Sequence, residues 1–200
     1  MTYKFRFPGL PEYNADAAGL KFREFNFYPI SVPGSDVTPS PNPYGLSASA
    51  WTTGNSGVTS SINRDITSSA TTFVFRGYFK PDQTATDWQF RTNSNDGSWL
   101  WIDGEAEVAT TALVTANANV KNGGQHSEAT VNSSNITLSQ SADNDLYYAF
   151  AVVAGNDPGG GSIKVQFRRG LGSWQTDGTG FFFHDSRRGD GFYPDAEEGA

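Results

Sequence analysis

Apolar and polar side chains alternate along much of the chain with the period of two that is typical of β-strands with one buried face. Residues 73–79, with the sequence FVFRGYF, place Phe73, Phe75 and Phe79 on one side of such a strand. Residues 146–154, LYYAFAVVA, are apolar on both sides and predict a central strand. Similar patterns predict strands over residues 19–30, 88–91, 98–102, 162–168 and 181–184. Because a single open sheet would expose its apolar face to water, they predict an all-β fold, a jelly-roll-like sandwich of two antiparallel sheets with long connecting loops.

Three segments break the alternation. Residues 31–49 contain several prolines, which cannot donate to a sheet ladder, and they predict a long surface loop. Residues 155–162, GNDPGGGS, predict a flexible connection between two strands. In residues 105–122 apolar side chains recur at helical spacing, but valine and threonine are frequent, so a helix and a strand with a loop both fit. We expect the strand with a loop.

The length of 200 residues suits a single domain. We therefore expect one sandwich over residues 1–200, in which residues 1–20 form an N-terminal arm and residues 185–200 form a C-terminal tail. The 22 glycines and 10 prolines interrupt the chain too often for long helices. No apolar stretch is long enough to span a bilayer, so we expect no membrane insertion.

The charge and the absence of cysteine narrow the classes of partner. The 14 Lys and Arg side chains are outnumbered by 21 Asp and Glu side chains, and the net charge of −7 argues against nucleic acid as a partner. There is no cysteine, hence no disulfide, thiolate metal site or cysteine nucleophile. The N-terminal sequence MTYKFRFPGLPEY lacks the continuous apolar run of a secretory signal peptide, so we expect synthesis in a reducing cytoplasm.

Two oxygen-rich turns are the candidate sites for chemistry. The first contains Asn95 and Asp96, followed by Gly97, and its residue types are typical of a hairpin turn. The alternative is a site for a hard cation, since Ca²⁺ binds convergent carboxylate, amide and carbonyl oxygens. The second turn contains Asn156 and Asp157, directly after the predicted central strand. If both turns lie at one end of the sandwich, these four side chains supply oxygen ligands to one ion.

Nothing in the sequence points to an enzyme. His126 and His184 are the only histidines, and no nucleophile-elbow sequence accompanies them. The carboxylates near residues 87–107 fit solvent exposure better than a glycosidase pair. Trp51 and Trp174 flank predicted loops, where an indole either stacks on a sugar ring or, as the better interpretation, packs beneath the loop.

The run from Phe75 to Ala106 resembles the GLEYA, or flocculin, branch of the anthrax protective-antigen-type β-sandwich family. That family has a GYF-xPP-xTG-xYxF strand pair, an Asp-Asp turn and then an apolar strand. The second block, residues 146–167, resembles the family's strand, glycine-rich loop and strand, and residues 19–30 and 177–185 resemble its first and closing strands. The matching positions of the strand pair are Gly77, Tyr78, Phe79, Pro81, Thr84, Trp88 and Phe90, with Asn95-Asp96 at the Asp-Asp position.

The resemblance implies a flocculin-like adhesin module whose end loops bind a sugar through Ca²⁺. In the adhesins two aspartates joined by a cis peptide, together with an asparagine from a later loop, hold the ion, and sugar hydroxyls complete its coordination. Carried over, these roles fall on Asn95, Asp96 and Asn156, with Asp157 as a further ligand. Because Asn95 replaces an aspartate and removes one negative charge, we expect weaker or abolished Ca²⁺ binding.

Two functional hypotheses follow. The first is a lectin whose partner is a cell-surface glycan or polysaccharide. The second is a structural component of a multi-subunit particle, such as a bacteriophage tail, fibre or capsid decoration. We favour the combination, a non-enzymatic virion-surface protein that contacts host polysaccharide during attachment. The alternatives are a purely architectural particle subunit without a ligand and a cellular surface lectin.

Overall fold

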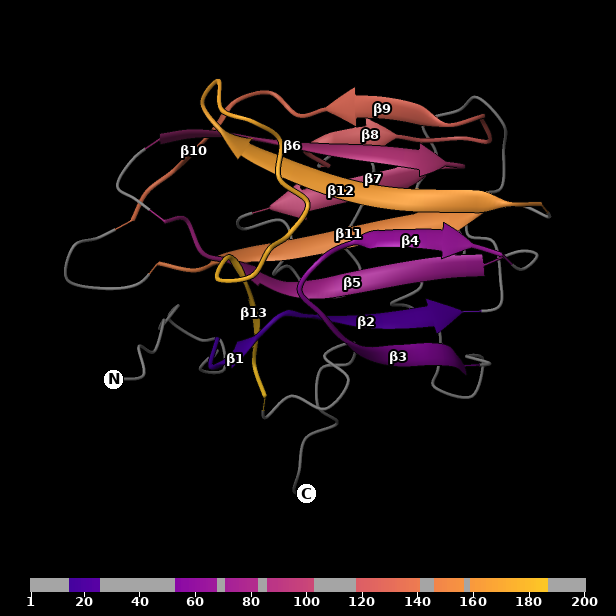
Figure 1. Cartoon of the computed structure of the whole chain (residues 1–200), viewed down its shortest axis with the longest axis horizontal. Coiled ribbons are helices and arrows are strands. Elements are labelled where there is room, and N and C mark those ends of the chain that lie inside the picture. The colour runs from indigo at the N-terminus through magenta and orange to yellow at the C-terminus, as the bar shows by residue number, and fades with distance from the viewer. Residues whose placement is uncertain are drawn as a thin grey trace, which may run out of the picture.

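The computed structural model describes residues 15–25, 53–67, 71–82, 86–102, 118–140, 146–156 and 159–186. These residues form two antiparallel β-sheets that pack face to face (Figure 1). The two-sheet sandwich predicted from the alternating pattern is therefore confirmed. The predicted loop over residues 31–49 and most of the ambiguous segment 105–122 lie outside the described residues.

The larger sheet has eight strands in the order β1-β13-β5-β11-β7-β8, with β2 pairing with β5 and β3 pairing with β2. The predicted central strand is β11, which pairs with β5 on one side and β7 on the other. Nearly all of its side chains are buried, which explains why the sequence there is apolar on both sides. The strands are β1 (Ala17–Ala18), β2 (Leu20–Phe25), β3 (Thr53–Thr59), β5 (Thr71–Phe79), β7 (Ser98–Ile102), β8 (Val120–Asn122), β11 (Tyr148–Asn156) and β13 (Phe182–His184).

The smaller sheet has five strands in the order β10-β6-β12-β4, with β9 also pairing with β6. They are β4 (Asn63–Ile66), β6 (Thr86–Asn95), β9 (Ala129–Asn132), β10 (Ile136–Leu138) and β12 (Gly161–Arg169). Along β6 from Asp87 and along β12 from Ser162, buried residues alternate with more exposed ones. One face of each strand therefore packs into the core, and the other face points away from the sandwich.

An aromatic cluster centred on Phe79 fills one end of the core. Phe79 is fully buried, and its ring lies 5.0 Å from that of Trp88 and 5.1 Å from that of Phe90, both on the opposite sheet. These pairs have the edge-on geometry that aromatic rings favour. Further rings around Phe79 are those of Phe150, Phe167, Phe181 and Phe182. The predicted core positions Trp88, Trp99 and Trp101 are also buried, at 1% exposure or less.

Several short strands carry no alternation that predicts them. β3 has the polar sequence TGNSGVT, and β4 has the sequence NRDI. Within the segment expected to be an N-terminal arm, β1 pairs with β13. At the end of segment 105–122, the described residues form strand β8. The described residues include no helix that is long and apolar enough to cross a membrane.

Candidate functional site

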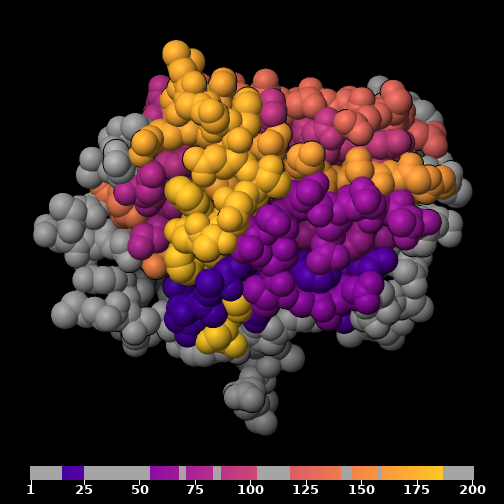
Figure 2. All heavy atoms as spheres, viewed as in Figure 1, coloured from indigo at the N-terminus to yellow at the C-terminus, as the bar shows by residue number. Residues whose placement is uncertain are grey.

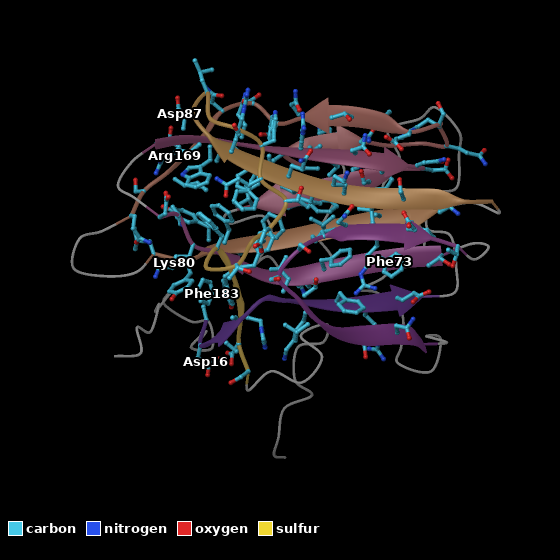
Figure 3. All side chains as sticks on the ribbon, in the orientation of Figure 1. Asp16, Phe73, Lys80, Asp87, Arg169 and Phe183 are labelled. Atoms are coloured by element: carbon cyan, nitrogen blue, oxygen red, sulfur yellow. The ribbon has the colours of Figure 1, made fainter. Side chains whose placement is uncertain are left out.

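Three connections between the two sheets meet at one end of the sandwich, which we call the rim. They join β6 to β7 through residues 96–97, β8 to β9 through residues 123–128, and β11 to β12, where the structure describes residues 159–160. The rim lies where β6 ends and β12 begins, at the right of Figure 1. In Figure 3, Phe73 lies toward this end, and Asp87 and Arg169 lie at the opposite one.

Hydrogen bonds tie the three connections together. The backbone N–H of Gly155 donates to the carbonyl oxygen of Gly97 at 2.9 Å. The backbone N–H of His126 donates to Oδ1 of Asp96 at 3.1 Å. The turn at residues 95–96 and the end of β11 therefore meet at the rim, as expected if they belong to one site.

Asn95 lies between two of these connections, and its peptide bond to Asp96 is cis. In one orientation of its amide, Nδ2 donates to the carbonyl oxygen of Gly160 at 3.3 Å. In the opposite orientation, Nδ2 donates to the carbonyl oxygen of His126 at 2.9 Å and to Oδ1 of Asp96 at 3.1 Å. The choice between the two is an inference from the hydrogen-bond network. In either case hydrogen-bond acceptors surround the amide, and an aspartate here would need a cation to balance them.

Asn156 ends β11 and is 1% exposed. Its Nδ2 donates to the carbonyl oxygen of Gly159 at 3.0 Å, which fixes the amide so that Oδ1 points toward Gly161. A Cβ atom built on Gly161 would lie 2.3 Å from that Oδ1 and 2.3 Å from the carbonyl oxygen of Asn95. The two oxygens are thus no more than twice this distance apart. Oxygens that share one Ca²⁺ each lie about 2.3–2.6 Å from it, so this separation suits a shared ion.

A buried polar network supports the turn from below. The hydroxyls of Ser94 and Ser98 are 2.8 Å apart, and Nδ2 of Asn122 donates to Oγ of Ser94 at 3.0 Å. The same Nδ2 donates to the carbonyl oxygen of Ala129 at 3.0 Å. Because buried polar groups are costly to leave unpaired, this network fixes the start of β7 against β8 and β9. It thereby positions Asp96, two residues away.

The oxygen donors of the rim fit a hard cation. Asp96 supplies a carboxylate and is only 6% exposed, Asn156 supplies an amide oxygen, and Asn95 supplies a carbonyl oxygen. Carboxylate, amide and carbonyl oxygens are the ligands of Ca²⁺, whereas Zn²⁺ favours nitrogen and sulfur. The described part of the chain has no group of three or more His, Cys, Asp or Glu side chains arranged to hold a metal. With Asn at position 95 and one carboxylate at the turn, the site carries little negative charge.

The structure brings Asn95, Asp96 and Asn156 together but leaves Trp174 elsewhere. Trp174 follows β12 and is half-buried beside Arg91 and Arg168 on the outer face of the smaller sheet. Asn95 lies four positions after Arg91 on β6, which is about 13 Å along an extended strand. The other predicted site residues, Asp157 and Trp51, lie outside the described residues.

Two contributors to the rim have no clear signature in the sequence. His126 acts through its backbone, as the donor to Asp96, so its side chain gave no signal for this role. Gly161 acts by having no side chain. The glycine run at 159–161 was visible in the sequence, but it indicates a flexible loop as readily as a close approach.

Replacing Gly161 with alanine should open the rim. The new Cβ would meet the carbonyl oxygen of Asn95 and Oδ1 of Asn156, so one of them must move. We expect the free energy of unfolding in urea to fall by about 1–3 kcal/mol, the usual cost of overpacking. Gly160→Ala is the matched control, because a Cβ there has no atom within 4 Å. Equal stability of the two variants would contradict the described contact.

The sequence family agrees with this geometry. Residues 71–169 match the GLEYA domain family, from the first residue of β5 to the last residue of β12. This half of the chain, which contains Asn95, Asp96 and Asn156, belongs to the GLEYA domain family, as the resemblance in the sequence predicted. A comparison with curated proteins gives no match.

Solved structures show that the whole sandwich is a known architecture. The Epithelial Adhesin 6 A domain from Candida glabrata, in complex with Galβ1-3GlcNAc, is 14% identical with a TM-score of 0.60, over 90% of this chain and 92% of that one. The PA14 sugar-binding domain from an RTX adhesin is 13% identical with a TM-score of 0.58, over 84% and 99%. The PA14 domain of the MpAFP antifreeze protein is 13% identical with a TM-score of 0.60, over 90% and 96%. At these identities the likeness establishes the shared fold.

Proposed function

We propose that the domain is a non-enzymatic glycan-binding module of the adhesin type, and that its rim binds Ca²⁺ through Asp96, Asn156 and Asn95. The observation that carries the proposal is the approach of Oδ1 of Asn156 to the carbonyl oxygen of Asn95, directly before Asp96, where connections between the sheets meet. The sugar complex of a protein with the same fold supports it. Asp157 stays a predicted fourth ligand.

The residues of the rim have separate tasks in this proposal. Bound Ca²⁺ supplies a site at which a pair of sugar hydroxyls replaces water, because the ion accepts six to eight oxygens (roughly) in flexible geometry. The Asp96 carboxylate balances part of the positive charge, and the N–H of His126 holds that carboxylate in place. Asn156 is held by Gly159, so its Oδ1 is oriented before any ligand arrives. Trp51 stays a candidate for stacking on the sugar, with packing beneath its loop as the alternative.

A glycan array probed in Ca²⁺ buffer and again in EDTA tests this proposal. Because the first neighbour is complexed with Galβ1-3GlcNAc, terminal β-galactosides are the first probes. We expect signals from neutral glycans that EDTA removes. Signals that are unchanged in EDTA would refute the role of the ion, and a blank array together with no heat of Ca²⁺ binding would refute the function.

Asn95→Asp should strengthen Ca²⁺ binding and lower the stability of the metal-free protein. An aspartate removes the N–H that donates to the acceptors around position 95 and places a second carboxylate beside Asp96. Without Ca²⁺ we expect the free energy of unfolding to fall by about 1 kcal/mol, the usual contribution of a hydrogen bond, because Asn95 is only half-buried. With Ca²⁺ we expect affinity to rise about tenfold or more, since affinity follows the ligand charge.

Calorimetry with Ca²⁺ and thermal unfolding in EDTA measure the two effects on Asn95→Asp. Asn93→Asp is the matched control, because Asn93 faces outward from the same strand and donates to Thr130 at 2.8 Å, away from the turn. The same gain in Ca²⁺ affinity in both variants would contradict a site at position 95.

We further propose that the module is displayed on the surface of a bacteriophage particle. The absence of cysteine supports a protein made in a reducing compartment. Electron microscopy of purified virions labelled with an antibody against this chain tests the proposal. Labelling at symmetry-related positions is expected, and labelling of the host cell envelope alone would favour the alternative, a cellular lectin.

A further inference from the structure

The outer face of the smaller sheet carries a line of cations in a protein whose net charge is −7. On β12, Lys164, Gln166 and Arg168 point outward, and on β6 the residue opposite Gln166 is Arg91. Arg91 and Arg168 are therefore diagonal neighbours on one face of an antiparallel pair, about 7–8 Å apart at the backbone. The segment after β12, orange to yellow in Figure 2, runs across this face.

Trp174, in that segment, joins the two arginines into one cluster. The guanidinium carbon of Arg91 lies 4.2 Å from the centre of the Trp174 ring, and that of Arg168 lies 4.5 Å from it. Both are within the range of a cation–π contact, which is about 6 Å. The indole thus holds two positive charges close together, although like charges repel.

Glutamines rather than carboxylates fix the orientation of the arginines. Nε of Arg91 donates to Oε1 of Gln166 at 2.9 Å, and Nε of Arg168 donates to Oε1 of Gln89 at 2.9 Å. Gln166 is itself held, since its Nε2 donates to Oγ1 of Thr176 at 3.2 Å. Among the described residues no carboxylate pairs with either arginine, and the two terminal nitrogens of Arg91 make no hydrogen bond. Burial and the nearby charge of Arg168 both lower the pKa of Arg91.

Two carboxylates at the same end of the smaller sheet bind other groups. Asp82 pairs with Arg169 at 3.0 Å, and Asp87 accepts from the hydroxyl of Thr137 at 3.0 Å. Arg169, on the same strand as Arg168, is therefore an arginine whose charge is paired with a carboxylate. Arg91 and Arg168, in contrast, form a pre-oriented pair of cations with no carboxylate partner in the part of the chain that the structure describes.

We propose that Arg91, Arg168 and Trp174 bind the acidic group, a carboxylate or a sulfate, of a charged saccharide. A guanidinium fork matches the planar carboxylate and two oxygens of a sulfate, and the indole keeps the two guanidinium groups close together. Lys164 extends the positive charge along β12 toward Ser162, which pairs with Asn95 at the rim. The choice of a saccharide rests on the proposed glycan-binding function, whereas the anion site itself uses no residue of the rim.

Three polymers with the same backbone test the inference: dextran sulfate, carboxymethyl dextran and unsubstituted dextran. They are immobilised, and the full chain is passed over them in EDTA, which removes any contribution of Ca²⁺ at the rim. We expect binding to one or both acidic polymers, weakening as salt is added, and none to dextran. Arg91→Ala and Arg168→Ala should each weaken binding about tenfold, and Arg91→Lys should recover only part of the loss because lysine lacks the fork.

Arg169→Ala and Leu171→Ala are the controls. The first removes the same charge from β12 but from an arginine already paired with Asp82, and the second removes a 96% exposed side chain from the Trp174 loop. The inference would be overturned if Arg169→Ala and Arg91→Ala lost the same amount of polymer binding. It would also be overturned if the chain bound double-stranded DNA as well as it binds the acidic polymers, or if it bound neither acidic polymer. Acid-selective binding in EDTA supports it even if the Ca²⁺-dependent array is blank, so the two proposals fail separately.

Discussion

Asp96→Asn should abolish Ca²⁺-dependent glycan binding while leaving the fold in place. The substitution removes the carboxylate of the turn but keeps an oxygen that accepts the N–H of His126. Because Ca²⁺ affinity depends on the number of charged ligands, we expect it to fall about 100-fold or more. The free energy of unfolding in EDTA should change by about 1 kcal/mol or less, since the shape is conserved. Calorimetry with Ca²⁺ and urea unfolding give the two quantities.

The matched control for this prediction is Asp65→Asn. Asp65 is an exposed residue of β4, opposite Ser162 near the rim, so its replacement changes the local electrostatic field without contacting the turn. We expect at most a severalfold loss of Ca²⁺ affinity there, because an exposed charge is screened by solvent. Equal losses of Ca²⁺ affinity in the two variants would mean that the rim attracts cations only through its overall negative charge and not through ligation by Asp96.

Phe79→Ala should be the most destabilising substitution in the core. Its ring is fully buried and lies 5.0–5.3 Å from the rings of Trp88, Phe90 and Phe167. Truncation leaves a cavity between the sheets, and we expect a loss of about 3–5 kcal/mol in the free energy of unfolding. Urea unfolding followed by tryptophan fluorescence measures it.

The control for the core prediction is Phe183→Ala. Phe183 pairs with Tyr78 beside this cluster, but its half-buried ring lies on the other face of β13, 5.3 Å from the ring of Tyr147 (Figure 3). We expect a loss of less than half that of Phe79→Ala, because less apolar area returns to water. A cost for Phe183→Ala that equals or exceeds that of Phe79→Ala would contradict the position of Phe79 at the centre of the core.

The long strands were predictable because the pattern of apolar and polar residues in each of them reflects which of its side chains are buried. β11 is apolar on both faces because the side chains on both of its faces are buried, and β12 alternates because one of its faces is more exposed. β3 and β4 were not predictable from the same pattern. They form by pairing with β2 and β12, so their backbone bonds, rather than their side chains, place them in the sheets.

The side chains of the rim were predictable, but its geometry was not. Asn95, Asp96 and Asn156 are polar residues at the ends of predicted strands, and the resemblance to the GLEYA family assigned roles to the same positions. The rest of the rim depends on backbone groups and on an absent side chain, which no residue type indicates. They are the backbone oxygens, the N–H of His126 and the Cα of Gly161. The sequence likewise did not show that Trp174 lies with Arg91, which is 83 positions earlier but only one strand away.

A titration of the ¹⁵N-labelled chain with Ca²⁺, followed by amide chemical shifts, locates the ion directly. We predict saturable shifts for the amides of Asp96, Gly97, His126, Asn156 and Gly161, with the indole signal of Trp174 unmoved. No saturable shift at these amides, or shifts confined to another part of the sandwich, would contradict a cation site built from the connections between the two sheets.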